Sequence, residues 1–270
     1  MTSVHRFQQL LQTPEDQPID RHVLLQAIQA RHSVRRYLPN AIDRTTIAIL
    51  QDHVNRINHY SGLHIQLVLN EPKAFRGIFA YGTFKQVSNY FVMAGPKGEG
   101  FKERIGYYGE QLVLLSQILG LNTCWAGLSY TKIPGTYVLE SGEAISCYIA
   151  LGKGETSGVV RKSKTPEQVS SIDDHTPEWF RQGVEAALLA PTAINQQKFS
   201  FEWIPAISGA RPQVKAHKGF SLVGYTQTDL GIAKLHFEIR ADKKLFDWTV
   251  CIRPKISTTL RNHISFLCFM

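Results

Sequence analysis

Four basic residues surround one serine in the segment RHSVRRY, residues 31–37. Arg31, Ser33 and Arg35 alternate along it, so an extended backbone would turn two guanidinium groups and a hydroxyl to the same side. Guanidinium groups form charge-assisted hydrogen bonds with phosphate oxygens, so this spacing suits a phosphate group. A basic patch at a helix end, whose arginines lie along the surface or pair with carboxylates, fits the same residues.

A second basic group, RKSK at 161–164, lies in the polar, Gly/Ser-rich segment 153–170, a composition typical of a linker. The formal net charge of +8 favours anionic partners. Lysine and arginine are nevertheless spread along the chain, without a helix-turn-helix, zinc-finger or aromatic RNA-binding pattern. We therefore expect no nucleic-acid partner, and binding through the net charge stays an alternative.

Composition indicates a globular protein, because 43% of the 270 residues are hydrophobic, enough for one large core or two packed halves. The N-terminal residues are polar, and no apolar run approaches the roughly 20 residues of a membrane helix. We expect a cytoplasmic protein with no membrane partner. The cysteines are scattered, which favours free, buried thiols over a metal site or disulfides: Cys124, Cys147, Cys251 and Cys268.

Helices are predicted after Asp20 and Asp43, because each residue can cap a helix and is followed by apolar residues at helical spacing. Pro39 blocks continuation of the first helix, which places the basic segment at its exit. The run from Tyr107 to Gly120 is apolar almost all round and predicts a buried central helix. Strands are predicted at HIQLVL (64–69), NYFVMAG (89–95) and AISCYIALG (144–152).

The second part of the chain repeats the first. Thr176 and Pro177 predict a helix start, and sliding residues 43–68 onto 177–202 matches the apolar positions of a helix and a strand. A similar match relates 109–118 to 228–237. We predict a first half at 1–165, a second half at 166–248 and a tail at 249–270 without clear periodicity.

Four separated stretches, in order, resemble the flavin-dependent nitroreductase superfamily: residues 31–37, 109–128, 151–169 and 190–201. The resemblance implies an α+β nitroreductase-like fold with mixed or antiparallel sheets and central helices. Enzymes of this family are homodimers with the flavin at the subunit interface. Here the first half has Ser61 and Leu63 where the repeat places Asn195 and Gln197, and the second half lacks the basic segment. The chain therefore resembles a fused, monomeric pseudo-dimer with one site.

The resemblance also implies roles for individual residues around one FMN. Arg31 and Ser33 would hold the phosphate end together with Lys162 and Lys164, and Arg35 would lie near the N1 and C2 edge of the ring. His32 is counted among the cofactor-binding residues of the same segment, as a surface side chain rather than an acid or base. The backbone of Ala126 and Gly127 would face flavin N5, and the second half would close the ring pocket with Pro191, Thr192, Asn195 and Gln197.

The implied activity is a ping-pong oxidoreductase reaction. NAD(P)H would reduce the flavin, and a nitroaromatic, quinone or similar acceptor would then take the electrons. No dedicated side-chain acid or base is predicted, as expected for cofactor-borne chemistry. Lys198 stands where the family usually has proline, and Lys164 where it often has arginine. The alternative is a non-catalytic flavin- or nucleotide-binding protein of the same fold.

Overall fold

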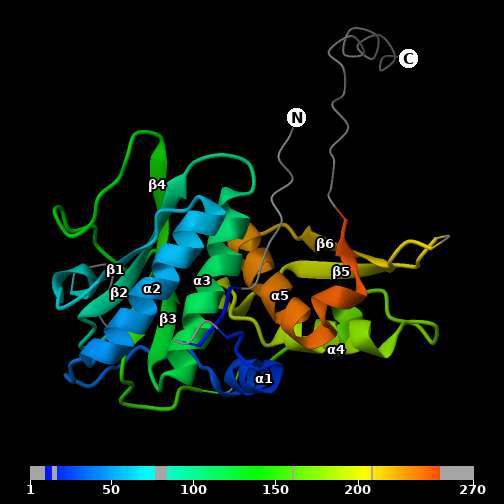
Figure 1. Ribbon diagram of the computed structural model, residues 1–270, viewed down its shortest axis with the longest axis horizontal. Helices are drawn as coiled ribbons and strands as arrows, with labels where there is room; N and C mark the ends of the chain where they lie inside the picture. The colour runs from blue at the N-terminus through cyan, green and yellow to red at the C-terminus, as the bar shows by residue number, and fades with distance from the viewer. Residues whose placement is uncertain (1–9, 14–16, 77–83, 160, 208, 250–270) are drawn as a thin grey trace, which may run out of the picture.

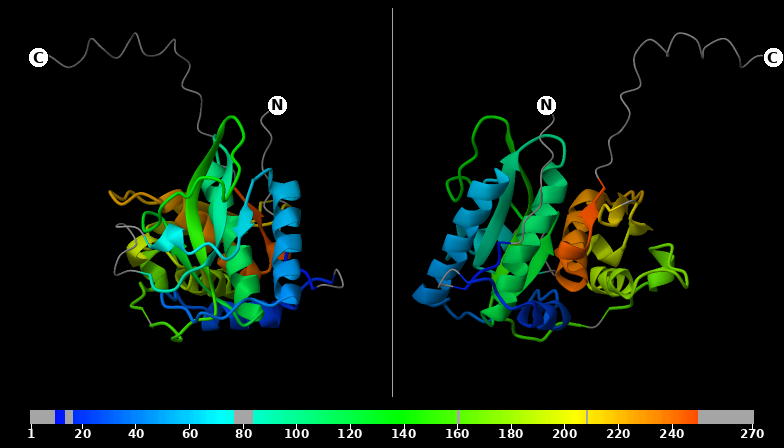
Figure 2. Two further views of the ribbon diagram at one scale, coloured as in Figure 1. Left: turned by 90° about the vertical axis from the view of Figure 1, so that its left-hand side faces the viewer. Right: turned by 45° about the vertical axis from the view of Figure 1, so that its right-hand side comes forward.

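The computed structural model describes residues 10–13, 17–76, 84–159, 161–207 and 209–249. Two sheets lie on opposite sides of the molecule, and two long helices, α3 (Phe101–Ile118) and α5 (Thr226–Ala241), lie side by side between them (Figures 1 and 2). This is the α+β architecture expected from the sequence. Of the predicted tail at 249–270, only Thr249 is described; its backbone N–H donates to the carbonyl of Val214 (2.9 Å), and residues 250–270 lie outside the described residues.

The first helices begin where the sequence predicts. The Asp20 carboxylate accepts from the backbone N–H of His22 (2.7 Å) and caps α1 (Arg21–Ala30). The Asp43 carboxylate accepts from the backbone N–H of Thr46 (2.9 Å) and caps α2 (Arg44–Ser61). These bonds satisfy N–H groups that have no partner within the helix.

The first sheet has the strand order β1-β2-β4-β3, with neighbouring strands antiparallel. The predicted strands are confirmed, although β1 is shorter than its segment. No strand was predicted for the residues of β3, which follows α3 and forms one edge of the sheet. The bounds are β1 (Gln66–Val68), β2 (Asn89–Pro96), β3 (Asn122–Ala126) and β4 (Glu143–Gly152).

Helix α3 starts at Phe101, earlier than the predicted Tyr107. Its first turn carries polar residues that conceal the apolar pattern. The structure shows why these residues are compatible with a buried helix: Arg104 is itself buried, and Glu103 forms an ion pair with Lys234 of α5 (2.8 Å). A polar residue with a tertiary partner is indistinguishable in sequence from an exposed one.

The second half contains α4 (Glu178–Leu188), a β5–β6 hairpin (Phe199–Ile204 and Gln213–Lys218), α5 and β7 (Asp247–Trp248). Strand β6 pairs antiparallel with β5 and parallel with β7. The prediction of Thr176 as the α4 cap is wrong. The capping position is Pro177, and the Thr176 hydroxyl instead donates to the Asp173 carboxylate (2.9 Å), which is available on the preceding turn.

The two halves are related by the predicted repeat. The capping positions of α2 and α4, Asp43 and Pro177, coincide in the repeat, and each helix is followed by an antiparallel pair of strands and a core helix. Leu50 and Val184, which the repeat pairs, are both fully buried. The repeat therefore describes real structural equivalence.

The two core helices cross through glycines. A Cβ atom on Gly106 would lie 1.9 Å from the carbonyl oxygen of Thr228, and one on Gly231 would lie 2.1 Å from that of Glu103. Glu103 precedes Gly106 by the same number of residues as Thr228 precedes Gly231. The two contacts are therefore equivalent, and they make Gly106 of α3 the counterpart of Gly231 of α5. This equivalence replaces the one from the apolar match, which paired Gly109 with Thr228.

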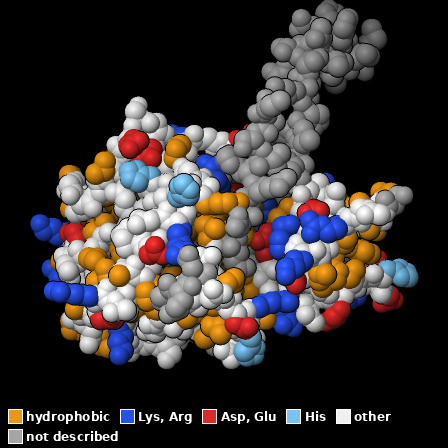
Figure 3. Space-filling view, in the orientation of Figure 1, with side chains coloured by type: hydrophobic (Ala, Val, Ile, Leu, Met, Phe, Trp, Pro, Cys, Tyr) orange, Lys and Arg blue, Asp and Glu red, His pale blue; other side chains and the backbone are white. Residues whose placement is uncertain are grey.

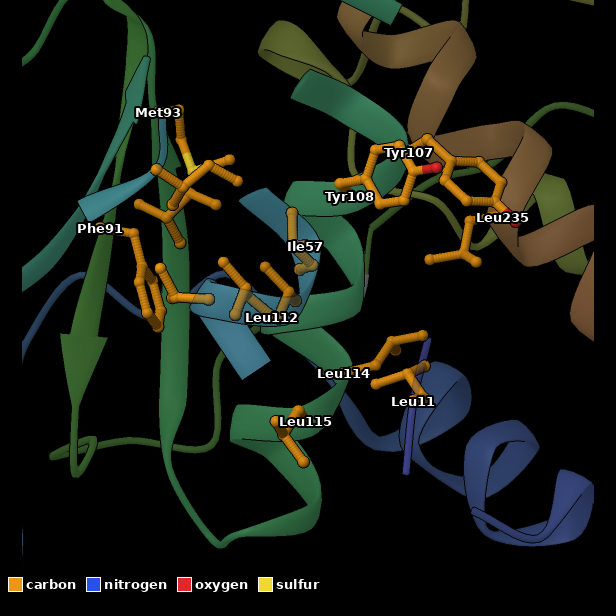
Figure 4. Close-up of a cluster of buried hydrophobic side chains, with 14 of the residues drawn as sticks. Leu11, Ile57, Phe91, Met93, Tyr107, Tyr108, Leu112, Leu114, Leu115 and Leu235 are labelled. Carbon is orange, nitrogen blue, oxygen red and sulfur yellow. The ribbon is translucent and has the colours of Figure 1, made fainter. Parts of the chain in front are cut away.

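The largest hydrophobic core surrounds α3. One side of α3 faces Phe91 and Met93 of the first sheet, and the side that carries Tyr107 faces Leu235 of α5 (Figure 4). A second core joins α4, α5 and the second sheet, and Trp125 packs against both cores. The two halves therefore share their interior.

The described surface agrees with a mixed charge pattern. On the face shown in Figure 3, lysine and arginine side chains lie at several separate places, with acidic and hydrophobic side chains between them. Within the described part of the chain, no helix has the length and hydrophobicity needed to cross a membrane. Cys124 and Cys147 are free and buried, as predicted, whereas Cys251 and Cys268 lie outside the described residues.

Candidate functional site

The basic segment leaves α1 in an extended conformation and runs beside β3. The Val34 N–H donates to the carbonyl of Thr123 (3.0 Å). Burial raises the pKa of the Cys124 thiol on β3, while the charges of Arg35 and Arg31 and a hydrogen bond with Ser33 oppose that shift. All three side chains therefore lie near the same thiol, as the alternating spacing predicts.

Arg31 is buried at the C-terminal end of α4. Its Nη1 donates to the carbonyl of Leu189 (3.3 Å), and its Nε lies 3.9 Å from Oε1 of Glu110 without a hydrogen-bond partner. Arg161, which the sequence analysis left out of the site, donates to the carbonyls of Leu189 and Ala190 (2.9 Å to Ala190). Two arginines thus bind the negative end of one helix.

The convergence of these arginines has an electrostatic consequence. Burial, and to a lesser extent the charge of Arg31, lower the pKa of Arg161 to about 10, while Glu110 opposes the shift. His32 lies beside them, its Nδ1 3.0 Å from the carbonyl of Arg31. Burial and the charges of Arg31 and Arg161 lower the pKa of His32, which favours its neutral form. An anion at this place would relieve the repulsion between like charges.

The linker and the second-half turn meet, as predicted. The Asn195 side-chain amide donates to the carbonyl of Lys162 (2.7 Å), and the Lys164 ammonium donates to the carbonyl of Gln197 (2.7 Å). The Gln197 side chain accepts from the N–H of Lys164 (2.8 Å) and donates to Ser163 and to the end of α4. Gln197 therefore ties three segments together, whereas Oδ1 of Asn195 is buried and has no partner in the part of the chain that the structure describes.

The turn at residues 191–197, hereafter the ring-contact turn, has a strained backbone. Ile194, Asn195 and Gln197 have φ values of 47°, 57° and 43°, a left-handed region that residues other than glycine seldom adopt. Pro191 is buried, and the Thr192 hydroxyl accepts from the N–H of Gln197 (3.1 Å). Strain of this kind persists only where surrounding contacts enforce it.

Asp229, in the first turn of α5, supplies some of those contacts. Its carboxylate accepts from the backbone N–H of Ala193 (3.0 Å) and from the side-chain amide of Gln196 (2.6 Å). Burial raises the pKa of Asp229 to about 6, and the two hydrogen bonds oppose that shift. Asp229 was not among the predicted site residues, because α5 carries several other polar residues that look the same in sequence.

The segment that follows β3 is fixed from the second half. A Cβ atom on Gly127 would lie 2.6 Å from Cζ of Tyr225, and the Tyr225 hydroxyl donates to the carbonyl of Gly127 (2.8 Å). Ala126 is buried next to it. The indole N–H of Trp125 donates to the buried Glu110 carboxylate (3.0 Å). The backbone predicted to face N5 is thus held on both sides.

Glu110 connects these parts across the two core helices. Its Oε1 lies 2.9 Å from Nε2 of His236, whose Nδ1 lies 3.2 Å from the carbonyl of Ala186. Glu110 and His236 have no exposed surface. The imidazole of His236 therefore lies between a carbonyl oxygen of α4 and a carboxylate oxygen of α3. The same carboxylate is near Arg31 and bound to Trp125, and therefore spans both ends of the predicted site.

The residues present fit a flavin phosphate cofactor. Cationic groups gather at one end, at Arg31, Arg161 and Lys164, and backbone from the first half meets the ring-contact turn of the second. Three buried polar atoms at this place, Nε of Arg31, Oδ1 of Asn195 and Oε1 of Gln196, lack a partner within the described residues. The Arg31 nitrogen is a donor suited to an anion, and the Asn195 oxygen is an acceptor suited to a ring N–H.

Solved structures were found that are similar to this chain. A putative nitroreductase from Thermotoga maritima MSB8 has the same fold, with a TM-score of 0.54 and 18% identity over 89% of this chain and 88% of that chain. A putative nitroreductase in complex with FMN from Desulfovibrio desulfuricans has a TM-score of 0.46 and 15% identity, over 57% of this chain and 98% of that chain. A nitroreductase-like protein from Streptococcus mutans has a TM-score of 0.48 and 15% identity, over 56% of this chain and 97% of that chain. No curated protein matches the sequence.

A family model described as a putative TM nitroreductase matches residues 23–241. The match spans both halves and includes every residue predicted to contact the cofactor. The chain therefore belongs to the putative TM nitroreductase family.

Proposed function

We propose that this protein binds one FMN between its two halves and uses it for NAD(P)H-dependent reduction of nitroaromatics, quinones or similar acceptors. One observation carries the proposal. The basic segment of the first half reaches the end of α4, where Arg31 binds the carbonyl of Leu189, and the linker reaches the ring-contact turn that follows α4, where Asn195 binds the carbonyl of Lys162. One chain thus supplies both sides of a site that two subunits form in related enzymes.

The phosphate end would be held by Arg31, Ser33, Lys162 and Lys164, and we add Arg161 to this set. Lys162 is exposed, and the Lys164 ammonium is anchored on the carbonyl of Gln197. A dianionic phosphate would offset the converging charges of Arg31 and Arg161, and charge-assisted bonds of this kind are among the stronger ones in proteins.

The ring end would be formed by Ala126, Gly127, Pro191, Thr192 and Asn195. Oδ1 of Asn195 would accept from a ring N–H, which would satisfy a buried atom that has no other partner. Bound FMN supplies the two-electron chemistry. Arg35 would lie where negative charge develops on the reduced ring and would stabilise it.

Gln197 has a different part in this proposal. Its side-chain amide is already bonded to Lys164, Ser163 and Leu188, so it holds the linker against the ring-contact turn instead of contacting the ring. This internal bonding and the anchoring of Arg31 on Leu189 favour one second candidate function, a flavin-binding protein without turnover.

An absorbance titration with FMN, followed by anaerobic NAD(P)H, tests both candidates. We expect FMN binding and bleaching of the bound flavin. Arg31→Ala should weaken FMN binding by about 1.5–3 kcal/mol, the scale of a hydrogen bond to a charged group. Asn195→Leu should impair binding from the other half of the chain.

The matched control is Arg36→Ala, because Arg36 lies in the same segment but pairs with Glu155 at the surface (2.8 Å). Equal affinity in the Arg31 and Arg36 variants would remove Arg31 from the site. Bound FMN that NAD(P)H leaves oxidised would exclude the reductase and leave the flavin-binding protein.

A further inference from the structure

The N-terminal end of α5 contacts both sides of the proposed site. Tyr225, at the capping position, binds the carbonyl of Gly127 in the first half. Asp229, in the first turn, binds Ala193 and Gln196 of the ring-contact turn. One rigid element therefore sets the distance between the backbone predicted to face N5 and the turn that would contact the ring.

Asp229 supports the part of the turn that most needs support. Ile194 and Asn195 are left-handed and lie between the two residues that Asp229 binds. Within the turn itself, the Asn195 N–H donates to the carbonyl of Thr192 (3.0 Å), which closes the turn but leaves its orientation free. The bonds to Asp229 attach it to the core helix.

We propose that Asp229 is a positioning residue that holds the ring-contact turn against the first half, and that protonation of its carboxylate loosens the turn and releases the flavin. This inference rests on the proposed function. It makes the retention of the cofactor dependent on pH through a group that does not touch the cofactor.

The hydrogen bonds explain the effect of a proton. An ionised carboxylate offers acceptors to both Ala193 and Gln196, whereas a protonated one turns one oxygen into a donor. That O–H would face the amide N–H of Gln196. The Gln196 amide cannot simply turn over, because its Nε2 also donates to the carbonyl of Gly224 (3.0 Å).

The surroundings make Asp229 the group that responds near neutral pH. Burial raises the pKa of Asp229 to about 6, and no charged side chain contributes to the shift. Its partners on the turn are uncharged. From β4 it is faced by the Cys147 thiol, whose pKa burial raises to about 12. Tyr225, whose backbone carbonyl accepts from the Asp229 N–H (2.9 Å), has a side-chain pKa that burial also raises. On α3, Glu103 is paired with Lys234, and Arg104 is buried.

Riboflavin is the suitable probe, because the phosphate of FMN itself titrates near pH 6. We expect wild-type protein to bind riboflavin about tenfold more weakly at pH 5 than at pH 7.5, the scale of one lost hydrogen bond. Asp229→Asn should show no such dependence and should bind at pH 7.5 about as weakly as wild type does at pH 5. Glu103→Gln, which breaks another contact between the core helices, should keep the wild-type profile.

Hydrogen exchange of residues 191–197 without flavin separates this inference from the proposed function. In wild type we expect the amides of the turn to exchange faster at pH 5 than at pH 7.5, after correction for the intrinsic rate. In Asp229→Asn we expect the corrected rates at the two pH values to be equal. If the exchange rate of the turn depends on pH as expected but the protein binds no flavin at any pH, the proposed function is overturned and the positioning role of Asp229 is retained. An Asp229→Asn variant with the wild-type exchange or riboflavin profile would overturn the inference.

Discussion

The ring of Tyr225 lies directly against Gly127, and its hydroxyl donates to the carbonyl of that glycine (2.8 Å). The contact joins the second half to the first at the backbone predicted to face flavin N5. Tyr225 reaches it from a left-handed conformation (φ 61°), which is unfavourable for a tyrosine. The conformation is therefore maintained by what the side chain contacts.

A methyl group at Gly127 should disrupt this contact. Gly127→Ala would place Cβ within 2.6 Å of the Tyr225 ring, so either the ring or the backbone must move. We expect weaker FMN binding and a lower free energy of unfolding. Adding Tyr225→Ala should restore part of the affinity, because it removes the atoms in conflict. A double-mutant cycle on FMN affinity measures this coupling, and strictly additive effects would contradict the contact.

The helix crossing makes a second prediction about stability. At Gly106 and Gly231 an added methyl group would meet backbone carbonyl oxygens, which cannot rotate away. We expect Gly106→Ala and Gly231→Ala each to lower the free energy of unfolding by about 3 kcal/mol or more, at the upper end of overpacking effects. Urea unfolding measures this change in the free energy of unfolding, and Lys102→Ala on the exposed side of α3 is the control. A tolerated methyl at either glycine would show that the helices cross elsewhere.

The two arginines at the end of α4 should differ in their roles. Arg161 binds two successive carbonyls, so Arg161→Ala should lower the free energy of unfolding by about 1.5–3 kcal/mol. Arg161→Lys keeps the charge but loses the fork that spans both carbonyls, and should recover only part of the loss.

Comparing FMN with riboflavin shows whether these cations also bind phosphate. Arg31→Ala and Arg161→Ala should weaken FMN binding more than riboflavin binding, because riboflavin lacks the phosphate. Equal losses for the two ligands would assign both arginines to the support of α4 alone.

The parts of this fold that could be predicted depend on local or periodic signals. Asp20 and Asp43 act on residues within their own first turns, and the alternation of Arg31, Ser33 and Arg35 follows from an extended backbone. The repeat appears in sequence because equivalent faces of α2 and α4 are buried.

The remaining features depend on contacts between distant segments. Glu110 and His236 are polar residues on core helices, and only the pairing of α3 with α5 gives each a partner. The sequence favoured the lysines of RKSK over Arg161, because the reach of a guanidinium to the end of α4 depends on how the linker crosses the second half. The apolar match of residues 109–118 with 228–237 differs from the equivalence seen at the helix crossing for the same reason, since apolar positions match in several registers and the glycine contacts select one.

The pH dependence of stability tests Asp229 without any ligand. Its folded-state pKa of about 6 lies above the ordinary value of 3.8, so the folded protein binds the proton more tightly than the unfolded chain. Between about pH 4 and pH 6 the folded state therefore carries more protons at this site. By linkage, the contribution of Asp229 to stability falls as the pH rises through that window and is constant above it.

Urea unfolding of wild type and Asp229→Asn at pH 4.5, 5.5 and 6.5 measures this contribution. As the pH rises, the free energy of unfolding of Asp229→Asn should increase relative to that of wild type, because asparagine has no charge to bury. Other titrating groups are common to both proteins and cancel in the difference. A variant that gains relative stability at neutral pH while it binds riboflavin less well would show that the buried carboxylate is retained at a cost to stability, as is frequent for residues that serve a site. A difference that does not change with pH would contradict the raised pKa and, with it, the assignment of Asp229 as the group that responds to pH.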